Sequence, residues 1–180
     1  MPREITPNQG RAGVQASSNN RLDLILNTPS LEILIGGPYT DRGGEEHTYG
    51  HAALRTISAT SERIYDFGRY AGITGDFGAE GEGILRIWSK FDSYIASENF
   101  LTRTTTGFLY KATASSIQAI DEHFSKLITG ATKRKPKHPN QEEYKLQRNY
   151  HGITNNCTTV TLAGAKIALP RIDYNAPSSQ

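Results

Sequence analysis

The residues of this sequence best suited to take part in a chemical reaction are its single cysteine and one of its five histidines. Cys157 follows two asparagines and precedes an apolar segment, so the pattern predicts a helix that begins at the thiol. A helix N-terminus favours a thiolate, because the helix dipole and the free N–H groups stabilise negative charge there. The same N–H groups can donate to an oxyanion on an attacked carbonyl. The alternative reading of a free cysteine in a helix is a buried structural residue.

His51 is the histidine best placed to act as a base for this thiol. It follows Gly50 and opens a predicted apolar strand, which would hold an imidazole at the end of a sheet. An imidazole there can take the thiol proton and later return it to a leaving amine. The alternative is a strand-edge histidine bonded to the backbone. The other histidines are less suited to this role, since surface or packing positions are expected for His123, His138 and His151.

A second constellation could bind a metal ion. Two imidazoles four residues apart stand beside two carboxylates, in the set Glu45, Glu46, His47 and His51. Zinc and iron accept such ligands. The spacing would aim both imidazoles at one ion only on a helix, and the neighbouring glycines disfavour a helix. We therefore expect no metal and no cofactor.

Composition limits the class of protein. With 180 residues, 36% hydrophobic and 21% charged, the chain can form one globular domain with a sizeable core. The formal charge of +2 is too small to indicate a nucleic-acid partner. Its basic excess lies mostly in residues 133–139, where two prolines favour a solvated loop. We find no apolar stretch long enough to cross a bilayer and no signal peptide, and we expect no stable membrane insertion.

Hydrophobic periodicity predicts an α+β fold, with an antiparallel sheet packed against helices. Strands are expected at 31–35, 51–57, 62–70, 84–88 and 104–111, and helices at 91–100, from Ser115 or Ser116 to 129, and at 157–169. Glycine-rich loops are expected at 40–46 and 68–83, the second as a candidate lining of a cleft. We divide the chain into a flexible N-terminal lead-in (1–21), one domain (22–170) and a C-terminal tail (171–180).

Several short motifs together resemble the permuted NlpC/P60-like branch of the papain-like cysteine hydrolases. They are residues 49–55 (YGHAALR), residues 64–68 (IYDFG), Tyr150, and the run Asn155-Asn156-Cys157. In that branch the histidine strand precedes the cysteine helix. The resemblance spans roughly residues 31–169 and implies a circularly permuted papain-like sheet packed against helices.

The resemblance also implies roles. Cys157 would attack a carbonyl to form a thioester, and His51 would be its base. The residue that orients the imidazole would come from the next strand, where Asp66 fits best. Tyr65 is the alternative, because a one-residue slip in register exchanges the faces of a strand. The family often has His, Asn or Gln at this third position, so an aspartate departs from its pattern. The amide of Cys157 and the side chain of Asn156 are the candidate oxyanion donors.

By the same resemblance, the chain would be an amidase or endopeptidase that cleaves peptidoglycan stem peptides or cross-links. Small members without a signal peptide are similar to the antibacterial toxins delivered by type VI secretion. That implies synthesis in the cytoplasm, export by the secretion machinery to the periplasm of a target cell, and an immunity protein as partner. Two alternatives stay open. One is a protease or acyltransferase of the same fold acting on host proteins or lipids; the other is a non-enzymatic binding module, which the nine tyrosines would suit.

Overall fold

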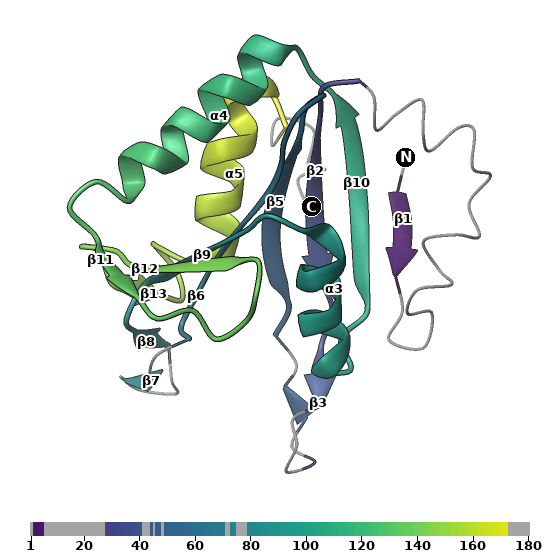
Figure 1. Ribbon diagram of the computed structural model, residues 1–180. Coiled ribbons are helices and arrows are strands. Elements are labelled where there is room, and N and C mark those ends of the chain that lie inside the picture. Colours follow the sequence, from purple (N-terminus) through teal and green to yellow (C-terminus); the bar gives the residue numbers. More distant parts are fainter. Residues whose placement is uncertain are drawn as a thin grey trace, which may run out of the picture.

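The computed structural model describes residues 2–5, 28–40, 44, 46–47, 49–70, 73–74 and 79–172 (Figure 1). It is an α+β structure. Its strands are β1 (Pro2–Ile5), β2 (Ser30–Gly36), β3 (Tyr39–Thr40), β4 (Glu46–His47), β5 (His51–Ile57), β6 (Glu62–Gly68), β7 (Ile73–Thr74), β8 (Glu80–Gly81), β9 (Ile84–Trp88), β10 (Thr105–Lys111), β11 (Thr132–Arg134), β12 (Gln141–Lys145) and β13 (Tyr150–His151). Its helices are α3 (Phe91–Phe100), α4 (Ala114–Leu127) and α5 (Cys157–Ala168).

One eight-stranded sheet organises the molecule, in the order β1-β10-β2-β5-β6-β9-β12-β11. Every neighbouring pair in it is antiparallel. The strands β5 and β6 lie at its centre, and almost every residue of β5 is buried. Both faces of the central strands are therefore covered, which explains why their sequences carry few exposed positions.

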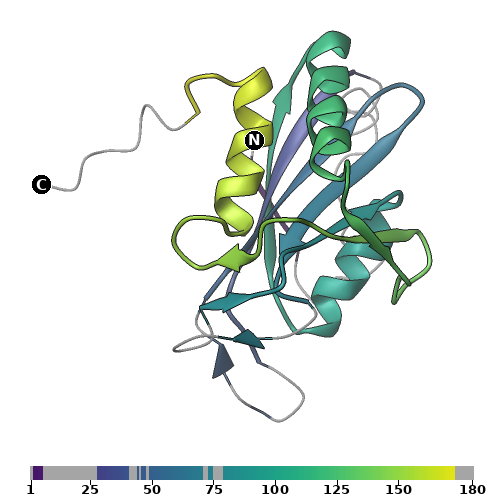
Figure 2. The same ribbon diagram turned by 90° about the vertical axis from the view of Figure 1, so that its left-hand side faces the viewer.

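Helices α4 and α5 cover one face of the sheet (Figures 1 and 2). The apolar side chains on this face form the larger core, which contains Leu31, Ile33, Leu54, Tyr65, Phe67, Leu85, Ile87, Ile117, Ile120, Phe124, Leu146 and Ala165. In β6 and β9 these are alternate residues, as expected when successive side chains of a strand point to opposite faces. The larger core thus holds α5, and its first residue, against the end of the sheet.

Helix α3 covers the other face, over β6 and β9. The smaller core here comprises Leu34, Ala53, Ile64, Trp88, Phe91, Tyr94 and Ile95. Buried charges share this face: Arg55 donates to Glu32 at 2.8 Å and to Glu62 at 2.8 Å, and its guanidinium lies over Phe91. Glu62 also accepts the Phe91 N–H at 2.9 Å, which ties the start of α3 to β6.

The long apolar elements agree with the sequence predictions. The predicted bounds match the structure for β5, β9 and α3, and α5 begins at Cys157 as expected. The start of α4 differs, because Thr113 and not Ser115 or Ser116 is the cap: its side chain accepts the Ser116 N–H at 3.1 Å.

Polar strands at the edges of the sheet differ from the predictions. The expected solvated loop at 133–139 is wrong at its start, because Lys133 and Arg134 belong to β11, where they pair with Glu142 and Glu82. Residues 2–5 of the predicted lead-in form β1, which pairs with the outer edge of β10. The loop expected at 68–83 contains β7 and β8. The rest of the predicted lead-in, most of the loop at 40–46 and residues 173–180 lie outside the described residues.

Gly164 lies where α5 packs against α4 and β5. A methyl group at its Cα would come 2.7 Å from Phe124 Cε2 and 2.8 Å from Leu54 Cδ2, and both of these side chains are buried. We expect Gly164→Ala to lower the free energy of unfolding by about 1–2 kcal/mol, since overpacking outweighs the gain in helix propensity. Denaturant titration measures this.

The matched control is Ala163→Gly at the adjacent exposed position of α5. It should lose about 1 kcal/mol through helix propensity alone. A Gly164→Ala protein more stable than the parent would show that α5 is not packed this closely.

Candidate active site

The position of His51 follows from the start of β5. His51 pairs with Gly36 of β2, and Gly50 just before it passes very close to the same strand. A Cβ on Gly50 would lie 2.7 Å from the carbonyl oxygen of Gly36, so glycine is needed for this approach. His51 is therefore fixed as the first residue of a central strand, which places its imidazole at the end of the sheet.

Asp66 lies on the neighbouring strand β6 and meets this imidazole. His51 Nε2 is 2.6 Å from Asp66 Oδ1. The carboxylate is fully buried and can only accept hydrogen bonds when ionised, so Nε2 carries the proton and donates it. The other ring nitrogen, Nδ1, is then left for the thiol.

Three further side chains hold the Asp66 carboxylate. Arg86 donates from Nε at 2.8 Å to Oδ2 and from a second guanidinium nitrogen to the same oxygen, and Trp88 Nε1 lies 3.4 Å from it. Tyr70 donates its hydroxyl to Oδ1 at 2.5 Å. Burial would raise the pKa of Asp66, but the charges of Arg86 and His51 and these hydrogen bonds hold it well below its usual value. The carboxylate is thus charged and fixed in orientation.

Tyr70, two residues after the end of β6, lies against both His51 and Asp66. Its oxygen is 3.1 Å from His51 Nε2 as well as bonded to Asp66, and its ring lies 3.4 Å from the Arg86 guanidinium carbon. A Cβ at Gly68 would come 2.6 Å from the Tyr70 ring, so only glycine lets the chain fold the tyrosine back over the carboxylate.

The N-terminus of α5 brings the thiol to this cluster. Asn156 caps the helix: its side chain accepts the Thr159 N–H at 2.9 Å, and the Thr159 hydroxyl accepts the Asn156 N–H at 2.9 Å. Cys157 is therefore the first residue of the helix, with 8% of its surface exposed. No acceptor for the Cys157 N–H is present in the described part of the chain, which leaves that amide able to donate to an oxyanion.

Cys157 and His51 stand 106 positions apart in the sequence, yet the fold brings them close enough for the imidazole to shift the pKa of the thiol. Burial raises the pKa of the thiol, but the hydrogen bond and charge of His51, with the Ala52 N–H, lower it to about 7. Burial lowers the pKa of His51, but Asp66 and the Cys157 contact raise it to about 10. At neutral pH the pair can therefore exist as a thiolate and an imidazolium, the reactive form of a cysteine nucleophile.

The structure thus brings together Cys157, His51 and Asp66. The alternative orienting residue, Tyr65, lies on the opposite face of β6, where it donates to Asp121 at 2.8 Å and stacks on Phe124. Asn156 is occupied as the cap, and its amide donates to the Gly152 carbonyl at 2.7 Å.

Sequence reasoning missed the residues that surround the triad. Tyr70, Arg86 and Trp88 hold Asp66, and Tyr150 lies close enough to Cys157 that burial and the neighbouring thiol raise the pKa of its hydroxyl. A signal for Arg86 was present, because an arginine in the middle of an apolar strand needs a buried anion on the same face. Tyr70 gave no comparable signal, since its position depends on the turn after Gly68.

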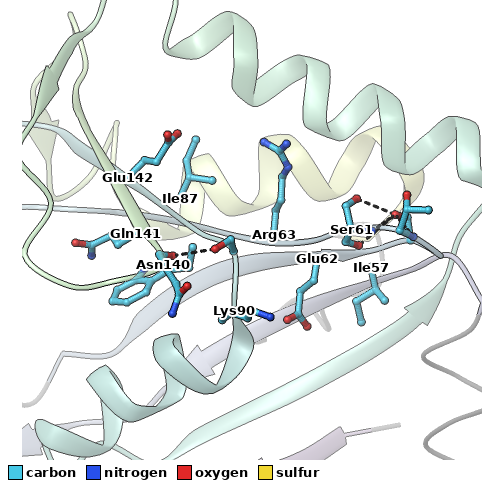
Figure 3. Close-up of a pocket in the computed structure, with 13 residues that line it drawn as sticks. Ile57, Ser61, Glu62, Arg63, Ile87, Lys90, Asn140, Gln141 and Glu142 are labelled. Atoms are coloured by element: carbon cyan, nitrogen blue, oxygen red, sulfur yellow. Dashed lines mark hydrogen bonds between the residues drawn. The ribbon is translucent and has the colours of Figure 1, made fainter.

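An open hollow lies elsewhere on the molecule (Figure 3). It is an open depression of about 800 Å³ lined by residues from the end of β5, the start of β6, the end of β9 and the start of β12. Figure 3 shows Glu62 and Arg63 leaving β6 on opposite sides. His51 stands at the other end of β5, so this hollow is not part of the site.

Among the described residues there is no group of three or more His, Cys, Asp or Glu side chains that could hold a metal ion. Glu45, one of the four candidate metal ligands, lies outside them. His47 instead stacks on Tyr39, with 4.6 Å between ring centroids. No helix among the described residues is long and apolar enough to span a membrane.

Comparison with known proteins returned no match: no family model, no curated protein and no solved structure matches this chain. Its function is therefore argued from the geometry of the site.

The paired charges predict how Cys157 reacts with iodoacetamide as the pH changes. With a thiol pKa of about 7 and an imidazole pKa of about 10, the thiolate forms while His51 still carries its second proton. We expect the alkylation rate to rise with a midpoint near pH 7, below the value of about 8.5 for a free cysteine. In His51→Gln the burial remains and the charge is lost, so the midpoint should rise by roughly one unit or more. A midpoint near 8.5 in both proteins would contradict the ion pair.

Asp66 and Tyr65 are adjacent on β6 but face opposite sides, so paired variants separate their roles. Asp66→Asn removes the charge that raises the His51 pKa, and the thiol midpoint should rise by roughly one unit. Tyr65→Phe removes only the hydroxyl bonded to Asp121 and should leave the midpoint unchanged. Thermal melts accompany the assay, because Asp66→Asn also leaves Arg86 without its anion at a cost of about 3–5 kcal/mol. Equal midpoints in folded samples of both variants would exclude Asp66 as the partner of the imidazole.

Proposed function

We propose that this protein is a cysteine hydrolase that cleaves an amide bond through a thioester. The observation that carries the proposal is the Cys157–His51–Asp66 arrangement, in which a thiol at a helix N-terminus meets an imidazole oriented by a buried carboxylate. A structural cysteine needs no such partners. A thiol pKa lowered to about 7 despite burial is typical of a nucleophile.

The geometry supports a two-step reaction. The Cys157 sulfur attacks the carbonyl carbon while the oxyanion accepts the Cys157 N–H at the start of α5. The His51 imidazolium then gives its proton from Nδ1 to the leaving nitrogen, and the C–N bond breaks to leave a thioester on Cys157. In the second step His51 takes a proton from water, the hydroxide attacks the thioester, and the C–S bond breaks to release the acid and restore the Cys157 thiolate beside the His51 imidazolium. Asp66 keeps Nε2 protonated throughout, so that Nδ1 faces the thiol in both steps.

The order of the elements is consistent with a circularly permuted papain-like fold of the NlpC/P60 type. The histidine strand β5 comes first, the strand with the orienting residue follows, and the cysteine helix α5 comes last. The helix packs against β5 and β6, and these two strands carry His51 and its partner Asp66. Tyr150, which belongs to the motif set, lies near enough to Cys157 that burial and the neighbouring thiol raise the pKa of its hydroxyl.

For the substrate we propose the peptide part of peptidoglycan, cut in its stem peptides or cross-links. The support is the resemblance to antibacterial amidase effectors, together with an exposed aromatic and basic surface beside the thiol, formed by Tyr49 and Arg69. As an effector, the protein would act in the periplasm of a target cell after delivery by a secretion system. The producing cell would then need an immunity protein that covers the site. Host proteins or lipids remain the alternative substrates if the wall is not cut.

Digestion of isolated peptidoglycan tests the proposal. We expect the purified protein to release new stem-peptide fragments, separated and identified by mass, and Cys157→Ala to lower the rate by about 10³-fold or more. Tyr65→Phe is the matched control, since it alters β6 on the face away from the site and should keep full activity. Fragments that appear equally with Cys157→Ala would overturn the proposed nucleophile. An intact wall beside a thiol that reacts at neutral pH would keep the cysteine hydrolase and exclude this substrate.

A further inference from the structure

Arg69 stands at the edge of the site, directly after β6, and is held between two tyrosine rings. Its guanidinium carbon lies 5.6 Å from the ring centroid of Tyr49 and 5.4 Å from that of Tyr150. These rings come from segments far apart in the sequence. Contact with two ring faces restricts the guanidinium and keeps it close to where the two segments meet.

Both tyrosines border the reacting pair. Tyr150 lies close enough to Cys157 that burial and the neighbouring thiol raise the pKa of its hydroxyl, and Tyr49 is two residues before His51. The ring of Tyr150 also stacks on buried Phe67, which fixes its place in the core. The positive charge of Arg69 is therefore anchored between the segment that leads into the histidine strand and the segment that precedes the cysteine helix, and Tyr49 in the first of these is 47% exposed.

Like Arg63 at the start of β6, Arg69 forms no ion pair with a carboxylate of the described residues, but of these two arginines Arg69 is the one at the end of the sheet that carries His51. Acidic residues pair with Arg55, Arg86, Arg103 and Arg134. A planar guanidinium presents a fork of N–H groups that fits a carboxylate in a bidentate manner, and ring contact on its faces leaves those edges available.

We infer that Arg69 binds a carboxylate of the substrate next to the bond that Cys157 attacks. The substrate class is thus a peptide or related amide with a free carboxylate close to the cleaved bond, as a side chain or a chain end. This inference rests on the proposed function, in that Cys157 is the nucleophile. It adds that an amidated or otherwise neutral substrate of the same shape is cut more slowly.

Two alkylating reagents of nearly equal size test the charge preference without any need for wall activity. Iodoacetate carries a carboxylate and iodoacetamide is neutral, and both react with the same thiolate. We expect Arg69→Gln to lower the ratio of the iodoacetate rate to the iodoacetamide rate by about 3- to 10-fold, with the iodoacetamide rate nearly unchanged. Arg69→Lys keeps a positive charge and should retain most of the ratio. Arg63→Gln, at the far end of β6, is the matched control and should change neither rate.

Two results would overturn the inference. An unchanged ratio in Arg69→Gln would show that Arg69 does not attract a carboxylate to the thiol. An equal fall in both rates would show that Arg69 acts on the thiol itself and not on the reagent. The failure of the proposed wall substrate looks different: the ratio would change as expected while peptidoglycan stays intact.

If the wall is cut, stem peptides with free and with amidated carboxylates extend the test. The parent should prefer the free acid through a lower KM, and Arg69→Gln should lose that preference.

Discussion

The Asp66 carboxylate is wholly buried in the sheet, and a buried charge is stable only where neighbouring groups replace the water it has lost. Arg86 supplies the opposite charge, while Tyr70, Trp88 and His51 supply further donors. Arg86 and Trp88 approach one carboxylate oxygen, and His51 and Tyr70 approach the other. The imidazole therefore cannot rotate without breaking its buried ion pair with Asp66. The orientation of His51, and with it the state of the thiol, follows from this constraint.

The two reacting side chains belong to opposite layers of the molecule. His51 and Ala53 are two residues apart on β5, so their side chains point to the same face of the sheet, the face that α3 covers. Cys157 begins the helix that covers the other face. They meet because each is the first residue of its element, at the same end of the sheet. The Asn156 cap fixes where α5 starts, and the pairing of Gly36 with His51 fixes where β5 starts. A shift of either element by one residue would separate the thiol from the imidazole.

Prediction from sequence succeeded where hydrophobic burial alone decides the structure. The apolar strands β5 and β9 and the helix α5 stand out because each strand is a short, almost wholly buried run and the helix is a longer apolar segment with a cap before it. The strand β12, with the sequence QEEYK, did not stand out because it is polar. Its charged residues pair with basic residues of β11, such as Lys133 with Glu142. Similarly, sequence could propose Asp66 but could not exclude Tyr65. That choice depends on which face of β6 turns toward His51, and register is set by pairing with distant strands.

The surroundings of the thiol bear on the kind of substrate it can serve. A small apolar substrate is normally enclosed in a concave pocket. The open depression of about 800 Å³ is at the far end of the strands, next to neither Cys157 nor His51. The described residues beside the thiol supply instead an exposed tyrosine and a cation held on ring faces, Tyr49 and Arg69. For the proposed hydrolase these two side chains are consistent with a substrate that carries polar groups, such as a peptide, whereas a lipid acyl chain would need a long apolar groove.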